Sequence, residues 1–256
     1  ATAKSYLGRV FHNLGELGKA EALTTEVVDY GRANWQNRPL DIYNTMVELG
    51  AIYQHQGRLA EAEKTYSQAF EGLMELVGEY HPSTLTALNN LGQVYEETGL
   101  YDKAEPILKQ ALVGYEEILG RGNQQTSRAR NNLALLYESQ GNFREAEPLY
   151  KESLAYLIET QGEDFTDTIA VRNNLAFLYM LMEDFEQSAE MFEQVLEQWM
   201  VLFGEDHQAT LKALNNLGRI YHRLNRLEEA EQLVLQALDI RRSVLGSEHP
   251  DVVRSM

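Results

Sequence analysis

Histidine and carboxylate side chains are the groups in this sequence that could carry acid–base or metal chemistry. The chain has 39 Asp and Glu residues, six His and no Cys. No two histidines lie within one helical turn of each other, and His81, His207 and His249 stand at multiples of 42 residues, which a repeat explains. Without cysteine there is no thiolate nucleophile and no Cys-rich zinc site. No two carboxylates stand out as an acid–base couple, because the acidic residues alternate with Lys and Arg as on a solvated helix face. The sequence therefore predicts no catalytic residue, no metal site and no cofactor, and hence a protein that is not an enzyme.

Doubled asparagines are the residues whose type and spacing favour binding instead. A side-chain amide offers both a hydrogen-bond donor and an acceptor, and asparagine usually prefers caps and turns to helix interiors. All the pairs fall in segments with helical spacing of apolar residues, so we expect each to have a hydrogen-bonding role. The pairs stand 42 residues apart, at Asn89-Asn90, Asn131-Asn132, Asn173-Asn174 and Asn215-Asn216.

These asparagines belong to a repeat of 42 residues that runs through the chain without an insertion. Its markers are a leucine followed by Gly or Ala, and a glycine in a loop. They recur at Leu7, Leu49, Leu91, Leu133, Leu175 and Leu217, and at Gly78, Gly120, Gly162, Gly204 and Gly246. A fixed period of this size indicates a solenoid of identical supersecondary units.

Each repeat is predicted to form two antiparallel helices. In the third copy, apolar residues follow helical spacing over residues 85–95, with Ser83 or Thr84 as the expected N-cap. Gly99 is expected to end this helix, and a second apolar stripe covers residues 102–120. The chain is therefore predicted to be all-α, with about twelve helices and no strand.

Small residues and aromatic rings alternate at fixed positions of the repeat. Gly92 and its counterparts in the other copies are never larger than alanine, which lets the two helices of a pair approach closely. An aromatic residue follows three positions later, and we expect the ring of Tyr95 to be buried in the adjoining space. This pattern predicts a continuous core along the array.

Composition excludes several classes of partner. The net charge of −17 disfavours binding to nucleic acid, which needs a basic face, and to an anionic membrane surface. No apolar run approaches the roughly 20 residues that span a bilayer. The sequence begins Ala-Thr-Ala-Lys, which is not a signal peptide. We therefore expect a cytoplasmic protein with no nucleic-acid or membrane partner.

The repeat resembles a known family. The residues that carry this likeness in the third copy are Leu91, Gly92, Tyr95, Gly99, Tyr101, Ala104, Leu108 and Ala111. They resemble the tetratricopeptide repeat, whose usual unit has about 34 residues. The longer period here, together with residues 131–137, 146–150 and the loop 78–82, is similar to the kinesin light chain subgroup. The resemblance covers the whole chain. It implies a right-handed superhelical solenoid whose first helices line a concave groove that binds extended peptides or partner helices.

The resemblance also assigns groove residues. The second asparagine of each pair is expected to tie one repeat to the preceding one, whereas the first maps to the groove and can pair with a peptide backbone; packing within the array is the alternative. Phe177, Met180 and Leu181 form an apolar stretch, for which packing against a neighbouring repeat is equally open. The groove candidates are Asn89, Asn131, Asn173, Asn215, Arg128, Phe177, Met180, Leu181, Lys212, Arg219 and Arg223.

The period also sets the expected domain organisation. We expect one domain over residues 1–256, in repeats of about 1–40, 41–82, 83–124, 125–166, 167–208 and 209–250. Residues 251–256 match the opening turn of a first helix, so a seventh repeat is expected to begin there. The chain is then a piece of a longer array, and its apolar last helix could associate end to end with another copy.

Taken with the resemblance, these features predict a scaffold that binds a protein or peptide in the groove and performs no catalysis. The arginines beside an apolar stretch favour a partner with acidic residues and an aromatic or aliphatic anchor. The alternative is a self-associating structural or regulatory segment of a larger protein, with the groove filled by another part of its own chain.

Overall fold

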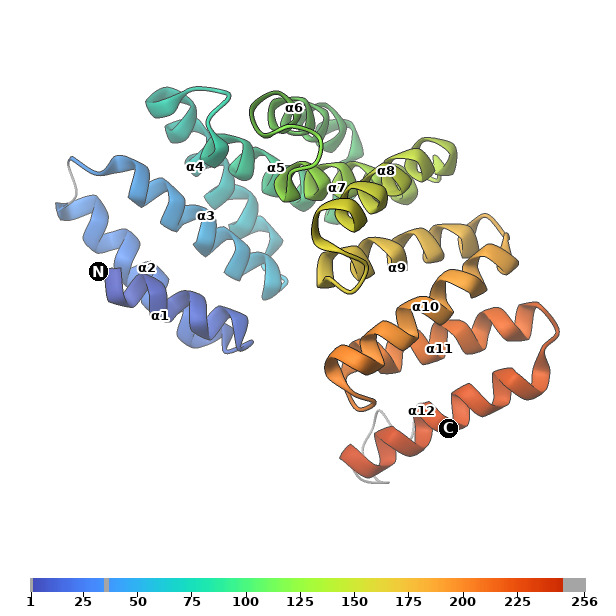
Figure 1. Ribbon diagram of the computed structural model, residues 1–256. Coiled ribbons are helices and arrows are strands. Elements are labelled where there is room, and N and C mark those ends of the chain that lie inside the picture. The colour runs from blue at the N-terminus through green and yellow to red at the C-terminus, as the bar shows by residue number, and fades with distance from the viewer. Residues whose placement is uncertain (1, 35–36, 246–256) are drawn as a thin grey trace. The chain divides into compact units, whose positions relative to one another are not determined.

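The structure is a computed structural model that describes residues 2–34 and 37–245. Within these ranges the chain forms twelve α-helices and no strand, as the sequence predicts (Figure 1). The helices are α1 (Thr2–Asn13), α2 (Leu17–Asn34), α3 (Pro39–His55), α4 (Leu59–Val77), α5 (Pro82–Glu97), α6 (Tyr101–Leu119), α7 (Gln124–Ser139), α8 (Phe143–Gln161), α9 (Thr166–Leu181), α10 (Phe185–Phe203), α11 (Gln208–Arg223) and α12 (Leu227–Leu245). The seventh repeat expected at residues 251–256 lies outside the described residues.

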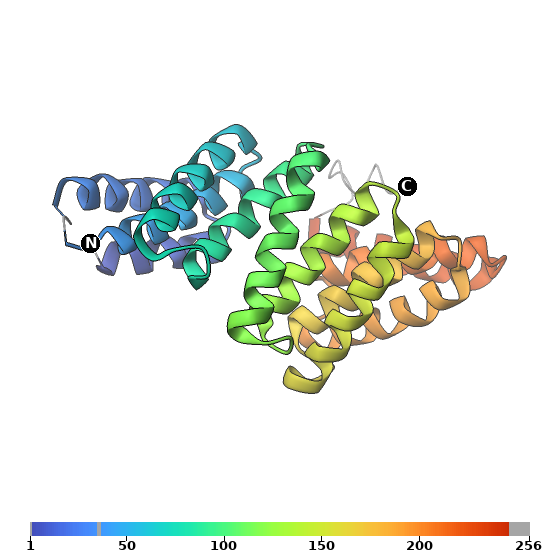
Figure 2. The ribbon, with the colours of Figure 1, turned by 90° about the horizontal axis from the view of Figure 1, so that it is seen from above.

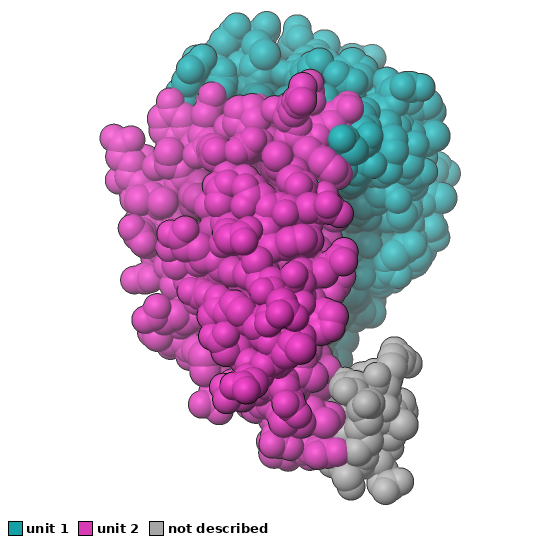
Figure 3. Space-filling view, turned by 90° about the vertical axis from the view of Figure 1, so that its right-hand side faces the viewer, with its two compact units in different colours: residues 1–141 teal, residues 142–256 magenta. Residues whose placement is uncertain are grey.

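The chain divides into two compact units, residues 1–141 and 142–256, which Figure 3 shows in different colours. The first unit holds α1 to α7 and the second holds α8 to α12. In both units, each helix packs against the next one along the chain (Figure 2). In the first unit the odd-numbered helices α1, α3, α5 and α7 also contact one another in sequence. That the whole chain forms one domain stays a prediction.

In four repeats, the second to the fifth, a threonine holds the loop glycine. The Thr84 hydroxyl donates to the Gly78 carbonyl at 2.8 Å, and Thr168 donates to Gly162 at 2.9 Å. The same bond joins Thr126 to Gly120 and Thr210 to Gly204. Each of these threonines is fully buried, so the bond satisfies a hydroxyl that would otherwise be costly to bury.

The N-cap expected at Ser83 or Thr84 was wrong. The cap of α5 is His81, whose ring nitrogen accepts a hydrogen bond from the Ser83 backbone N–H at 3.1 Å. Pro82 then takes the first helical position, where its missing N–H costs nothing. The Thr84 hydroxyl is drawn back to the Gly78 carbonyl, so it cannot serve as the cap.

The small residues of the repeat pack as expected, but the aromatic residues differ in how deeply they are buried. A Cβ atom added to Gly50 would lie 2.7 Å from the Tyr66 ring, so only glycine fits beside that tyrosine. Tyr179 is 2% exposed, whereas Tyr95 is only half-buried, which corrects the expectation that its ring is buried. Tyr95 lies at the surface between two repeats, where its hydroxyl interacts with Glu63 of α4 and partial burial raises its pKa.

Candidate functional site

Neighbouring first helices meet at residues that are 43 apart, one more than the repeat period. In the first unit, the Asn132 amide of α7 donates to the Asn89 amide oxygen of α5 at 3.1 Å. Seven residues further along both helices, the Ser139 hydroxyl donates to the Glu96 carboxylate. Each contact thus joins a residue to the one that follows its counterpart in the next first helix. A row of cross-helix polar contacts therefore follows the first helices.

The second asparagine of each pair ties repeats together where the contacts are seen. Asn132 is buried, and besides donating to Asn89 it accepts a hydrogen bond from Gln93 at 3.0 Å. Asn90 hydrogen-bonds to Tyr66 of the preceding repeat. These residues join a first helix to the repeat before it, as expected.

The first asparagines lie in different environments. Asn89 is 8% exposed, and its amide oxygen is already engaged by Asn132, so its geometry favours packing within the array. Asn215 donates to the Leu211 carbonyl of its own helix at 2.8 Å. Asn131 and Asn173 are half-buried. The four amides therefore do not form a uniform row of equally exposed groups.

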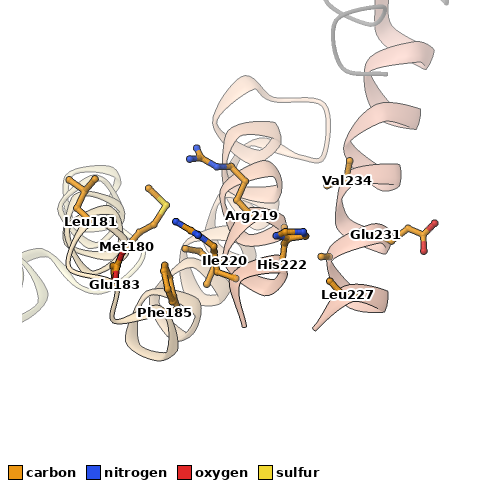
Figure 4. Close-up of a pocket in the computed structure, with 13 residues that line it drawn as sticks. Met180, Leu181, Glu183, Phe185, Arg219, Ile220, His222, Leu227, Glu231 and Val234 are labelled. Atoms are coloured by element: carbon orange, nitrogen blue, oxygen red, sulfur yellow. The ribbon is translucent and has the colours of Figure 1, made fainter. Parts of the chain in front are cut away.

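The second unit contains a hollow between α9, α11 and α12. It has a volume of about 720 Å³, within the range of small-molecule and peptide-anchor pockets. Figure 4 shows side chains from all three helices and from the start of α10 facing it. Its lining residues are Met180, Leu181, Glu183, Phe185, Gly218, Arg219, Ile220, His222, Arg223, Leu227, Ala230, Glu231 and Val234.

The floor of this pocket is part of the hydrophobic core. Met180 and Phe185 pack on a buried cluster that includes Ile220 and Ala230. The helices α11 and α12 approach each other closely beside the pocket: a Cβ atom added to Gly218 would lie 3.1 Å from Val234. Because Met180 and Phe185 pack on this cluster, the core fixes the floor of the pocket.

Apolar side chains also remain exposed around the pocket. Leu181 is 38% exposed, Leu227 is 53% exposed and Val234 is 42% exposed. These three come from two helices, α9 and α12, that meet at the pocket. Exposed apolar surface collected around a cavity is typical of a binding site for another molecule.

Positive charge lies over this apolar surface. Arg219 and Arg223 stand one helical turn apart on α11, and both are exposed. The Arg223 guanidinium lies 5.4 Å from the centre of the Phe185 ring, within range of a cation–π contact. In Figure 4 the Glu231 carboxylate points away from α11. In a chain with a net charge of −17, this places a local cationic rim beside an apolar floor.

The turn that leads into α10 carries backbone strain. Glu183 has a φ of +62°, whereas the corresponding residues Gly57, Gly99 and Gly141 are glycines with φ of +74° to +76°. Left-handed backbone disfavours a residue with a side chain, at a cost of roughly 1–2 kcal/mol. Glu183 lines the pocket, so the strained residue lies at the candidate site.

Four of the predicted groove residues line this pocket together, namely Met180, Leu181, Arg219 and Arg223. The others lie elsewhere. Phe177 packs against the core cluster of the second unit. Lys212 is exposed and Asn215 half-buried, both on the N-terminal half of α11, and Asn173 is half-buried on α9. Asn89, Arg128 and Asn131 belong to the first unit.

The sequence reasoning missed Phe185, Leu227 and Val234. All three follow the first helices, in the turn into α10 and on α12, and only first-helix residues were considered for the groove. For Leu227 and Val234 the sequence signal was the apolar last helix, from which only end-to-end association was expected. Among the residues described, no three His, Asp or Glu side chains are placed to hold one metal ion. None of the helices described is both long and apolar enough to cross a membrane.

Comparison with protein families gives one match. The tetratricopeptide repeat model matches residues 41–117, 97–159 and 167–243, which together make up well over half of the chain. The residues from which the sequence resemblance was drawn, 91–111, fall inside the matched segments. A comparison with individual curated proteins gives no match.

Solved structures with the same fold include repeats of the kinesin light chain type. BtubC (BKLC) from P. vanneervenii has a TM-score of 0.77 at 24% identity, covering 91% of this chain and 94% of its own. Nearly identical TPR-like repeats from Podosopora anserina, described as a kinesin light chain, have a TM-score of 0.70 at 23% identity, covering 81% and 97%. Both agree with the kinesin light chain resemblance of the sequence, and at these identities the likeness concerns the fold.

A third similar structure holds a peptide. NprR in complex with its cognate peptide NprX has a TM-score of 0.66 at 16% identity, covering 99% of this chain and 71% of its own. The apo form of NprR, a quorum sensor from B. thuringiensis, has a TM-score of 0.70 at 16% identity, covering 99% and 66%.

Proposed function

Because the chain belongs to the tetratricopeptide repeat family, we propose that it is a scaffold that binds a peptide or a segment of a partner protein. The binding site in this proposal is the pocket between α9, α11 and α12. Tetratricopeptide folds are typical protein and peptide interaction modules, and NprR, which shares the fold, binds the peptide NprX. The observation that carries the proposal is the pairing of an apolar floor with the arginines of α11.

The chemistry of the pocket indicates the kind of peptide. Met180, Phe185 and Leu227 offer a surface for one aromatic or aliphatic side chain, and burying such an anchor is usually the largest single contribution to an interface. Arg219 and Arg223 can pair with carboxylates on either side of that anchor. The expected ligand is therefore an extended acidic segment with one bulky apolar residue.

A charge-matched comparison tests the proposal. The probe is a short fluorescein-labelled peptide with one Trp flanked by Asp and Glu, and binding is measured by fluorescence anisotropy. Arg219→Glu should weaken binding by roughly tenfold or more, because it places a like charge beside the peptide. Lys212→Glu makes the same change in net charge at an exposed site outside the pocket on the same helix, and should change the affinity less than about threefold.

Two further measurements separate the contribution of the apolar anchor to binding from the contribution of charge. Replacing the Trp of the probe by Ala should remove most of the affinity if the apolar floor binds it. Raising the salt concentration should weaken the acidic probe through screening. Equal losses of affinity for Arg219→Glu and Lys212→Glu would contradict the pocket as the binding site. The losses would then reflect only the change in the net charge of the protein.

The alternative, a segment that binds its own chain or a second copy, rests on the exposed apolar residues of α12. Leu227 and Val234 lie at the pocket, and Leu235 is 49% exposed. Sedimentation velocity over a range of concentrations distinguishes the two ideas. Self-association that disappears in Val234→Glu would favour the alternative, whereas a monomer at all concentrations would favour a foreign peptide.

A further inference from the structure

Two histidines that are far apart in the sequence meet on the surface of the first unit. His12 is near the end of α1 and His55 is the last residue of α3. The Nε2 atom of His12 lies 2.6 Å from the Nδ1 atom of His55, and the ring centres are 4.8 Å apart. The sequence predicted no metal site because histidines close along the chain are lacking, but the offset of 43 residues between first helices brings these two together.

The same step of 43 residues joins other polar pairs in this unit. Gln54 donates to Glu97, and Ser139 donates to Glu96. Each of those pairs combines a donor with an acceptor that cannot exchange roles. His12 and His55 are different, because a neutral imidazole has one N–H and one lone pair and the proton can sit on either ring. The pair therefore presents two nitrogen ligands at one point on the surface.

We propose that His12 and His55 together bind a divalent transition-metal ion of the kind that prefers imidazole, such as Cu²⁺, Ni²⁺ or Zn²⁺. Imidazole nitrogens lie about 2.0–2.1 Å from Zn²⁺, so two on one tetrahedral ion stand roughly 3.3 Å apart. The observed 2.6 Å needs to open by less than 1 Å. His55 is exposed and His12 half-buried, so rotation of the two rings can provide this.

Charge and solvent access also suit a cation. The chain has a net charge of −17, which raises the local concentration of cations. Since no third His, Asp or Glu is placed to join them among the described residues, water completes the coordination. The ion is then exchangeable, and it links α1 to α3.

The first experiment measures metal binding by the full chain without an affinity tag. Isothermal titration with CuCl₂, NiCl₂ and ZnCl₂ in a non-coordinating buffer should show one site, with Cu²⁺ bound most tightly. His12→Gln and His55→Gln keep a polar side chain that can still form a hydrogen bond across the helices. Each should weaken binding by at least about tenfold, because each removes one of two ligands.

The control is His222→Ala, which removes an exposed histidine from the same repeat position as His12 but in α11 of the second unit. It should leave the affinity unchanged. Electron paramagnetic resonance of the Cu²⁺ complex should show coupling to two nitrogen nuclei in the wild type and in His222→Ala, and to one in the glutamine variants. Circular dichroism without metal checks that the variants fold.

The proposal is overturned if the wild type binds none of the three ions. It is equally overturned if a folded His12→Gln or His55→Gln variant binds as tightly as the wild type. Loss of binding in His222→Ala to the same extent would place the ion elsewhere and would also reject the pair as the site.

Discussion

The hydroxyl of Tyr179 on α9 donates a hydrogen bond to the Glu147 carboxylate of α8, 3.1 Å away. Lys151 donates to the same carboxylate at 2.6 Å. The arrangement recurs in the first unit, where Tyr137 donates to Glu105 at 3.3 Å. In these two repeats the glutamate thus receives the tyrosine of the next repeat. Such contacts between neighbours are the interface term on which the stability of a repeat array depends.

Removing the Tyr179 hydroxyl should measure how much this contact contributes to the stability of the protein. Tyr179→Phe keeps the buried ring, which is 2% exposed, but leaves Glu147 without one donor. We expect a loss of about 1 kcal/mol in the free energy of unfolding, the usual size for one hydrogen bond. Tyr80→Phe, at a tyrosine that is 48% exposed, is the control and should change little. Urea unfolding measures both, and equal effects would show that the contact contributes nothing.

We expect Glu48 to make the stability of the folded protein depend on pH. It occupies the repeat position of Asn132, and burial raises its pKa, although Arg9 lies 3.6 Å away and acts in the opposite direction. A raised pKa means that the fold favours the protonated acid. The ionised group therefore destabilises the fold increasingly as the pH rises from the ordinary value of 4.5 through the raised pKa.

Replacing Glu48 by the asparagine of the other repeats should remove this penalty. The buried Oε2 atom of Glu48 has no hydrogen-bond partner, so Glu48→Asn should stabilise the protein at pH 7.5 by about 1 kcal/mol, the scale of one unsatisfied polar group. The gain should shrink at pH 4.5, because a raised pKa means that more than half of the acid is then protonated in the folded protein. Urea unfolding at both pH values tests this, and a gain that does not depend on pH would rule out ionisation as the cause.

Glu183 predicts a gain of stability at the candidate site. Glu183→Gly restores the glycine found at the corresponding turn of other repeats and relieves the left-handed backbone, where φ is +62°. We expect the free energy of unfolding to rise by about 1 kcal/mol. Asn225 has a φ of +61°, but asparagine tolerates this conformation, so Asn225→Gly should gain less. An equal gain at both positions, measured by thermal unfolding, would contradict strain at Glu183.

The last prediction concerns a buried arginine that is paired with a carboxylate, unlike Glu48, whose burial is poorly compensated. Arg130 is fully buried and donates to Glu116 at 2.6 Å, at a repeat position where Leu88 and Leu214 stand in other copies. Arg130→Leu should be neutral or stabilising, because a packed leucine needs no desolvation of charge. Glu116→Ala should cost about 3 kcal/mol, because it removes a carboxylate partner of a buried cation. Chemical denaturation of both variants measures the difference, and the reverse order would show that the ion pair itself stabilises this repeat.

The sequence by itself determined the helices and their order. Helical spacing, loop glycines and the period of 42 residues depend on contacts a few residues apart, so one chain without any relatives suffices to predict twelve helices. The resemblance to the tetratricopeptide repeat also predicted that Asn132 would join two repeats, because it stands where that family usually has an asparagine. The arginines and apolar residues of α9 and α11 could be chosen as candidates because they share the helical face of the groove positions.

The tertiary structure decided which candidate residues share a site. Whether two residues meet depends on how neighbouring helices are aligned with each other, and a local sequence pattern does not predict that alignment. A step of 43 rather than 42 residues buries Asn89 against Asn132 and brings His12 to His55. The pocket also needs Leu227 and Val234 from α12 beside Met180 and Arg219. These side chains meet only because the small Gly218 lets α12 pack closely against α11, and the packing of the core sets that distance.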